Sequence, residues 1–235
     1  MPSRRSPTCP WQCSPGRCCA PPRRCRSAAW AKPPEPRSAA TPGPRSPITH
    51  APRRPPMAEP IPALIRTVRP GDARPIAEAH VQSWQATYRG LLPDSYLQGL
   101  ADNLQRRVDF IDNAIRNGNR DIRVAEHEGV VVGWSSFGPS RDTDVEPGTG
   151  ELYSIYLVPA AWSAGIGRAL WLASRQALEA AGFARITLWA LDGNARAERF
   201  YRTAGFTPQS NASRVFGEDG TAFPVTRYLL PLTHA

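Results

Sequence analysis

One stretch decides the fold: Val158-Pro159-Ala160-Ala161-Trp162-Ser163-Ala164-Gly165-Ile166-Gly167-Arg168-Ala169-Leu170. An apolar run, Leu152 to Val158, leads into it, and apolar residues at helical spacing follow it, so the order predicts a strand, a tight turn and a helix. A helix N-terminus attracts anions through its free N–H groups and its dipole. Gly165 and Gly167 have no Cβ, so a phosphate can approach the backbone closely, and Arg168 adds charge. Alone, the turn also fits an ordinary strand-to-helix connection.

Two common phosphate-binding signatures do not fit this stretch. A dinucleotide-binding turn carries a third glycine, which is missing here. A Walker loop needs Gly-Lys-Ser or Gly-Lys-Thr, which does not occur in the chain. The turn therefore needs a second motif before its ligand can be assigned.

The second motif follows one predicted helix and one predicted strand later. It has the pattern Asn-x-x-Ala-x-x-Phe-Tyr-x-x-x-Gly-Phe, formed by Asn194, Ala197, Phe200, Tyr201, Gly205 and Phe206. Together, the two motifs resemble those of the Gcn5-related N-acetyltransferase (GNAT) superfamily, over roughly Leu64 to Leu232. In that family, the glycine turn is the acetyl-CoA pyrophosphate loop and the second pattern also contacts the cofactor.

The resemblance implies an α/β (α+β) fold, with one GNAT-like domain around a mixed, mostly antiparallel central sheet flanked by helices on both faces. The hydrophobic pattern fits this order of elements. Strands are predicted at 64–68, 121–127, 130–137, 151–158, 185–191, 206–215 and 223–230, and helices at 72–88, 94–100, 102–116, 165–181 and 194–204. Asp72 is the expected cap of the first helix.

The first 56 residues differ from the rest of the chain. They hold ten Arg and one Lys against one acid, all five cysteines and fifteen of the 26 prolines. Such a composition buries too little apolar surface to offset the entropy of ordering. We therefore expect a disordered tail over 1–56 and an N-acetyltransferase domain over 64–235. A foldable sequence begins just after Met57. This favours Met57 as the natural start of the protein, with the start at Met1 assigned too early.

Three functions compete with this interpretation of the tail. Its cysteines could bind zinc, although no Cys-x-x-Cys pair occurs. Its acid-poor composition resembles an organelle transit peptide, although the prolines oppose an amphipathic helix. An arginine arm could also contact nucleic-acid phosphates. We expect no nucleic-acid partner and no metal site.

The predicted compartment is the cytoplasm. No apolar run approaches the roughly 20 residues needed to span a bilayer. No secretory signal is visible, and the region after residue 56 has no cysteine. The sequence thus predicts a protein without membrane contact, and it leaves homodimer formation open.

The resemblance also implies how the cofactor is held. The strand before the turn pairs with the pantetheine amides, which maps to Ile155, Tyr156 and Leu157. The turn amides hold the pyrophosphate, which maps to Ser163, Ala164, Gly165, Ile166, Gly167 and Arg168. Trp162 stands where the family usually has Gln or Arg, a departure that backbone binding should tolerate.

Two residues of the second motif receive roles. Tyr201 is the candidate acid, because a phenol with a pKa near 10 can protonate a thiolate of similar basicity as it leaves. The alternative is that Phe200 and Tyr201 are simply the apolar face of the helix. Asn194 can cap that helix, contact the cofactor, or do both.

Glu151 is the candidate base. It begins the strand that carries the cofactor, where the family often has a glutamate acting through water. An ordinary solvated carboxylate at the end of a strand is the alternative. His80, Glu146 and Asp144 are weaker candidates because no motif supports them.

The acceptor side is less determined. The resemblance suggests a backbone N–H, that of Leu157, for the oxyanion, with a nearby β-bulge. Trp84, Tyr88 and Tyr153 are candidate residues of the acceptor pocket, together with Tyr156, although aromatic residues at helical spacing also fit a core.

Taken together, the residues predict direct transfer of the acetyl group of acetyl-CoA, in a ternary complex, to a primary amine. The acceptor is expected to be a small molecule or a peptide. The alternative is a non-catalytic domain that binds or senses acyl-CoA through the same turn.

Overall fold

The structure is a computed structural model, and it describes residues 62–216 and 223–232. The predicted disordered tail, 1–56, lies outside these residues. The described residues all belong to the predicted N-acetyltransferase domain and the two residues before it.

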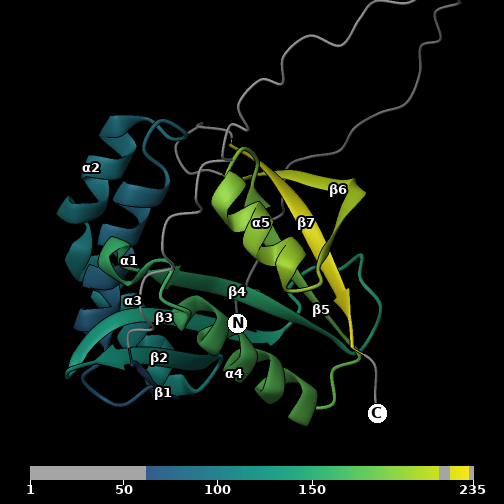
Figure 1. The fold of residues 1–235 in the computed structure, drawn as a ribbon, viewed down its shortest axis with the longest axis horizontal. Helices are drawn as coiled ribbons and strands as arrows, with labels where there is room; N and C mark the ends of the chain where they lie inside the picture. The colour runs from purple at the N-terminus through teal and green to yellow at the C-terminus, as the bar shows by residue number, and fades with distance from the viewer. Residues whose placement is uncertain (1–61, 217–222, 233–235) are drawn as a thin grey trace, which may run out of the picture. The chain divides into compact units, whose positions relative to one another are not determined.

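Seven strands form one sheet in the order β1-β2-β3-β4-β5-β7-β6 (Figure 1). β4 and β5 are parallel, and the other neighbouring strands are antiparallel. The strands are β1 (Leu64–Thr67), β2 (Asp121–His127), β3 (Val130–Pro139), β4 (Thr149–Leu157), β5 (Arg185–Leu191), β6 (Thr207–Phe216) and β7 (Phe223–Pro231). The predicted mixed, mostly antiparallel sheet is confirmed.

Helices cover both faces of this sheet. Trp134 of β3 packs with residues of α1 and α3, whereas the hydroxyl of its neighbour Ser135 lies 2.8 Å from that of Ser174 in α4. Successive side chains of a strand point to opposite faces, so these helices lie on opposite sides. The helices are α1 (Ala73–Thr87), α2 (Asp94–Asp102), α3 (Leu104–Asn117), α4 (Ile166–Ala180) and α5 (Ala195–Thr203).

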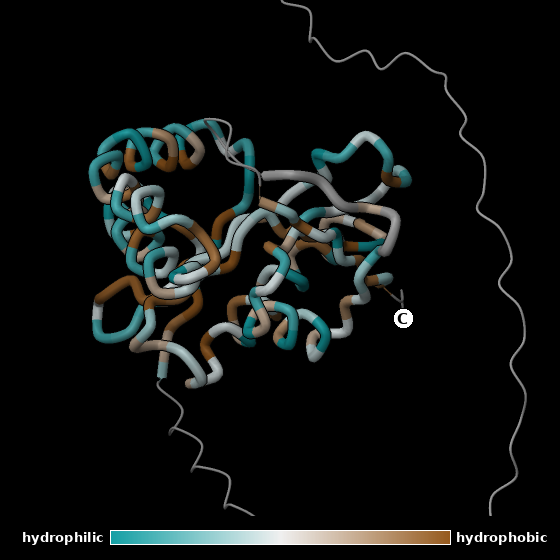
Figure 2. The backbone as a smooth tube through the Cα atoms, turned by 90° about the horizontal axis from the view of Figure 1, so that it is seen from above, coloured by the Kyte–Doolittle hydropathy of each residue, from teal (hydrophilic) through white to brown (hydrophobic). Residues whose placement is uncertain are grey.

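The largest core cluster lies between the sheet and the helices α4 and α5. Trp171 and Leu178 of α4 are 2% and 1% exposed, and they belong to the same cluster as Ile186 and Leu188 of β5. Figure 2 shows hydrophilic and hydrophobic positions alternating along the helices, as expected when each helix buries one face. This packing fixes α4 and α5 against the strands that form the site.

The first helix begins where the sequence predicts, but its cap differs. Asp72 occupies the N-cap position of α1 without a capping hydrogen bond from its side chain. Its carboxylate accepts bonds from the Arg66 guanidinium (2.7 and 2.9 Å) and from the Arg69 N–H (2.6 Å). The charged partner outcompetes the helix amides for the carboxylate, because charge-assisted bonds are stronger.

β4 and β5 separate along their length. Their register pairs only Thr149, Gly150 and Glu151 with Arg185, Ile186 and Thr187. Beyond these pairs the two strands diverge, and the sheet opens between them (Figure 1). This opening positions the site described next.

None of the helices within 62–216 and 223–232 is long and apolar enough to span a membrane.

Candidate active site

A pocket of about 430 Å³ occupies the opening between β4 and β5. Its walls come from Leu152–Leu157 of β4, from Trp189–Leu191 of β5, from the glycine turn and from α5. The two sequence motifs therefore meet in one cavity, as the resemblance implies. The pocket has a turn end, at Ser163–Arg168, and a strand end, at Tyr153 and Trp189.

The turn end is built from backbone. Ser163 and Gly165 have φ values of 63° and 82°, in the left-handed region. Gly165 is the N-cap of α4, and no side chain of the described residues caps this helix by a hydrogen bond. Free N–H groups at a helix N-terminus, approached through a glycine turn, suit a phosphate. Ser163, Gly165, Gly167 and Arg168 all line the pocket.

The remaining residues of the turn point elsewhere. Ala164 and Ile166 are 6% and 2% exposed, and they pack in an apolar cluster with Leu170. Their side chains are therefore unavailable to a ligand, and only their backbone amides can contribute. A small residue followed by a large aliphatic one suits this role, because the turn must anchor itself to the core.

Trp162 makes two contacts that the sequence did not predict. Its indole Nε1 donates to the carbonyl oxygen of Leu157 (3.0 Å), and the Arg196 guanidinium lies 4.3 Å from its ring centroid. Trp162 and Arg196 both line the pocket, one from the turn and the other from α5. The departure from the family pattern at Trp162 was the signal that could have indicated this contact.

The exposed edge of β4 faces the pocket. The Val158 N–H donates to the Val132 oxygen (2.9 Å), so the N–H of Leu157, one residue earlier, points away from β3. The bulge lies at Tyr153, because Ser154 pairs with Ser136 while Leu152 pairs with Phe137. It is thus four residues before Leu157, at the strand end of the pocket.

Tyr201 and Asn194 of the second motif both line the pocket. The Asn194 side chain accepts a bond from the Ala197 N–H (3.1 Å), so it caps α5 while bordering the cavity. Burial raises the pKa of the Tyr201 phenol above its ordinary value of 10.0, with Tyr156 and Tyr228 adding to the effect. Tyr201 therefore stays protonated, as an acid must before it donates.

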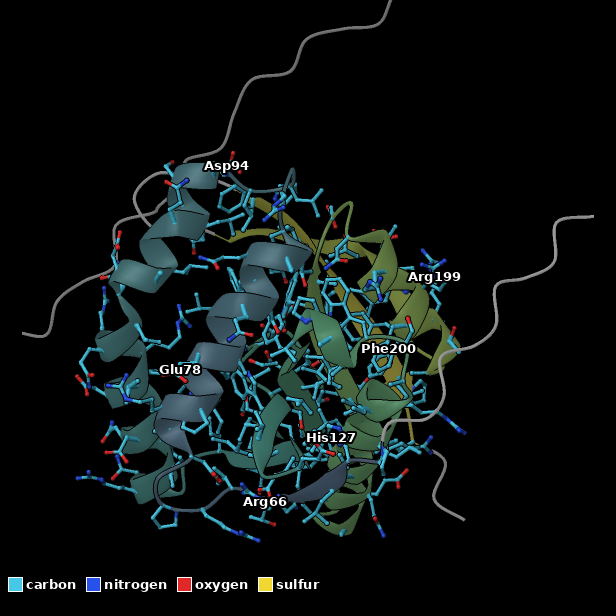
Figure 3. The ribbon with its side chains drawn as sticks, turned by 60° about the vertical axis from the view of Figure 1, so that its left-hand side comes forward. Arg66, Glu78, Asp94, His127, Arg199 and Phe200 are labelled. Carbon is cyan, nitrogen blue, oxygen red and sulfur yellow. The ribbon has the colours of Figure 1, made fainter. Side chains whose placement is uncertain are left out.

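Phe200 and Arg199 follow each other on α5 and turn in different directions. Figure 3 shows Arg199 projecting outward, and this residue is exposed. Phe200 is half-buried, packs against the main core cluster and lines the pocket. The helical spacing of the motif thus places Phe200 and Tyr201 on the inner side of α5.

Glu151 is buried and held. It is 1% exposed, and its carboxylate accepts bonds from the Arg141 backbone N–H (2.9 Å), Nε (3.2 Å) and Nη2 (2.5 Å). It does not line the pocket, whereas its neighbours on β4 from Leu152 onward do. This pairing could not be predicted from the sequence, because Arg141 lies ten residues earlier in a loop whose conformation the sequence does not specify.

The predicted acceptor residues divide into two groups. Tyr88 and Tyr153 line the pocket, and the Tyr88 hydroxyl lies 3.5 Å from that of Tyr156. Trp84 packs edge-on against Tyr88, with ring centroids 4.8 Å apart, and is not part of the pocket wall. Burial raises the pKa of Tyr88 well above 10.0 and raises that of Tyr156, so both phenols stay neutral.

The weaker base candidates lie away from the pocket wall. His80 is 5% exposed, stacked on Trp84 with centroids 5.0 Å apart. Asp144 pairs with Arg227 (2.6 Å), and Glu146 pairs with Arg185. The structure thus brings none of the three to the cavity.

Comparisons with known proteins agree with this geometry. Residues 81–206 match the model of the acetyltransferase (GNAT) family. The chain is 34% identical over 131 residues to the uncharacterised N-acetyltransferase YuaI of Bacillus subtilis, covering 55% of this chain and 72% of that protein. The chain therefore belongs to the acetyltransferase (GNAT) family, and it is an N-acetyltransferase by class.

Two further similarities are more limited. The chain is 33% identical over 135 residues to the mycothiol acetyltransferase of Frankia casuarinae, covering 53% of this chain but only 38% of that protein. The acetyl-CoA complex of yncA, a putative acetyltransferase from Salmonella typhimurium, superposes with a TM-score of 0.54 at 22% identity, covering 74% of this chain and 95% of that one. The latter likeness concerns the fold alone.

Proposed function

We propose that this chain transfers the acetyl group of acetyl-CoA directly to a primary amine of a small molecule or peptide, within a ternary complex. Membership of the family supports acetyl-CoA as the acyl donor. The observation that carries the proposal is the opening between β4 and β5, which joins an uncapped helix N-terminus to a tyrosine-lined cavity.

Cofactor binding is assigned to backbone groups. The amides of the turn, Ser163 to Arg168, would hold the pyrophosphate, and the edge of β4 that faces away from β3, from Ile155 to Leu157, would pair with the pantetheine. Leu157 would contribute its N–H, because its oxygen already accepts from Trp162. The left-handed φ of Ser163 and Gly165 and the absence of a side-chain cap support this. Asn194 would contribute from the start of α5, and the Leu157 N–H would stabilise the oxyanion.

The acid and base roles rest on different grounds. We propose Tyr201 as the acid that protonates the departing thiolate, supported by its position in the pocket wall. Glu151 remains our proposed base, acting through water as in the resembled family. Arg141 binds both of its oxygens, so the water would use the remaining lone pair of Oε1, which among the described residues accepts only from Nη2. Tyr88, Tyr153 and Trp84 are proposed for the acceptor side.

Calorimetry with the full chain tests the cofactor, and acceptor-dependent release of CoA tests the reaction. We expect micromolar binding of acetyl-CoA. Tyr201→Phe should lower kcat roughly 100-fold, the scale of general acid catalysis, while CoA affinity stays unchanged. Tyr228→Phe is the matched control, because this buried tyrosine contacts Tyr201 but does not line the pocket.

Unaltered turnover in Tyr201→Phe across the pH range would remove Tyr201 from the acid role. A folded chain without affinity for acetyl-CoA would contradict the whole proposal. The cytoplasm and homodimer formation stay predictions.

A further inference from the structure

Arg120 carries a charge that no acid of the described residues balances. Its guanidinium lies between two rings, 5.2 Å from the Phe110 centroid and 5.3 Å from the Tyr153 centroid. It forms no ion pair within residues 62–216 and 223–232, and its Nε is buried without a hydrogen-bond partner. A half-buried guanidinium usually has a carboxylate partner, because burial penalises an unpaired charge.

The nearby acids are already engaged. Glu151 accepts from Arg141, and Asp121, which follows Arg120 in the chain, lies 3.8 Å from the guanidinium of Arg123. Burial and the charge of Arg141 lower the pKa of Arg120 below its ordinary value, and the opposing effects of Tyr153 and Glu151 do not offset them. The cluster thus holds two positive charges, those of Arg120 and Arg141, against one carboxylate.

Arg141 is oriented by Glu151 and still has donors to offer. Its Nε and Nη2 bind the carboxylate, while Nη1 makes no hydrogen bond to the described residues. Its side chain is 53% exposed, and its guanidinium lies 4.3 Å from the centroid of the Tyr153 ring. A fixed guanidinium with a free edge is a preorganised partner for an oxyanion.

Tyr153 connects this pair of arginines to the pocket. It lines the cavity and is the bulged residue of β4, at the end of the pocket away from the glycine turn. Its hydroxyl donates to the Pro139 oxygen (2.5 Å), which fixes the ring that both guanidiniums contact. Neither arginine lines the pocket wall itself, so an acceptor that enters at this end would reach them past Tyr153.

We propose that Arg120 and Arg141 bind a carboxylate of the acceptor, so that the substrates of this enzyme are small amines that also carry a carboxylate. The inference rests on the proposed function, because the acceptor enters only if the pocket performs acetyl transfer. An acceptor carboxylate gives Arg120 the counter-ion that residues 62–216 and 223–232 do not provide. Because both guanidiniums contact the Tyr153 ring, their positions would also set the distance between the carboxylate and the amine of the acceptor.

The test uses the full chain with amino acids of increasing length between amine and carboxylate, each compared with its carboxamide. The two amines of a pair differ in basicity. We therefore take the kcat/KM of the amino acid divided by that of its carboxamide, for each variant, and divide this ratio by the same ratio for the wild type. This double ratio cancels their intrinsic reactivity.

Arg120→Gln should lower the preference for the carboxylate roughly 10- to 100-fold, the scale of a charge-assisted hydrogen bond. The loss should fall mainly on KM, and Arg120→Lys should restore part of it. Arg116→Gln is the control, because this exposed arginine on α3 pairs with Asp112 and lies outside the cluster. Calorimetry should give the same CoA affinity for all variants.

A second measurement needs no turnover. In the presence of CoA, a carboxylate acceptor should raise the Tm of the wild type and not that of Arg120→Gln. An unchanged preference in Arg120→Gln, or equal Tm shifts, would overturn the inference while leaving acetyl transfer intact. A chain that binds acetyl-CoA but acetylates none of the amines contradicts the proposed function and this inference together.

Discussion

The turn end and the strand end of the pocket are built in different ways. At the turn end, consecutive residues from Ser163 to Arg168 present backbone groups at the start of one helix. At the strand end, Trp189 of β5 and Tyr153 of β4 line the pocket, and Arg120 and Arg141, from separate parts of the chain, contact the Tyr153 ring. A ligand site made of local backbone tolerates changes of side chain, whereas a site made of distant side chains does not.

The difference extends to what holds each end in place. The loop before β4 is tied to β5 and β7: Trp189 Nε1 donates to Asp142 (2.8 Å), and the Arg227 guanidinium donates to Asp144. The turn end is anchored by apolar packing of Ala164 and Ile166. Hydrogen bonds and ion pairs to carboxylates therefore hold the strand end in place, and apolar packing holds the turn end.

The largest effect is expected from Gly165→Glu. The residue has a φ of 82°, which penalises any side chain, and the new carboxylate would repel an anion at the helix N-terminus. CoA affinity measured by calorimetry should fall at least roughly 100-fold. Gly182→Glu is the matched control: its φ is 83° and its Cβ also meets open space, but it follows the other end of α4. Similar CoA affinities in the two variants would break the comparison.

A smaller effect is expected from Arg141→Gln. It leaves the buried Glu151 carboxylate without its guanidinium, and because half of the Arg141 side chain is exposed, the free energy of unfolding should fall by about 2 kcal/mol. CoA affinity should not change. Urea denaturation measures the first and calorimetry the second.

Arg175→Gln controls for the loss of a more exposed ion pair, with Glu179 on α4, and should lower stability by less than about 0.5 kcal/mol. Equal losses in the two variants would mean that the Glu151 pair is no more important than a surface pair.

The smallest effect is expected from replacing His80, a buried histidine of α1. Burial, and the charge of Arg107, lower the pKa of His80 well below 6.5, so the folded protein holds this imidazole neutral. As pH falls below about 6.5, only the unfolded chain takes up the proton, and the folded state loses stability. His80→Phe should remove about 1.4 kcal/mol of this loss at one pH unit below that value.

The measurement is urea denaturation of wild type and His80→Phe from pH 7.5 to 5.5. As pH falls from 7.5 to 5.5, the wild type should lose about 1.4 kcal/mol of stability relative to His80→Phe. Parallel curves would show that His80 contributes no acid sensitivity to the fold.

Much of the fold could be predicted from periodicity and turn residues. The strands β2 and β5 begin and end at the predicted residues, and Glu128 and Gly129, both with positive φ, form the turn of the predicted hairpin. The short 3-10 helix at Pro159–Ala161 was not predicted, because three residues carry no period. The partner of Asp72 was also missed, since Arg66 reaches it from a neighbouring strand.

The site could be predicted where a role depends on neighbours in the chain. Asn194 caps α5, as its position before an apolar helical pattern indicates. Trp84 and Tyr88 are four residues apart on one helix, yet only Tyr88 lines the pocket. Spacing along a helix gives a shared face and does not say which residue of that face meets a cavity.

The sequence by itself determined the family, the order of the elements and the residues that form the glycine turn, because these depend on local backbone preferences and on two short motifs. Tertiary structure alone decided that β4 and β5 diverge after Glu151, that Arg141 holds this carboxylate, and that Arg120 lies beside Tyr153 without an ion-pair partner among the described residues. The physical reason is that charges pair through space, with partners that the order of residues does not specify.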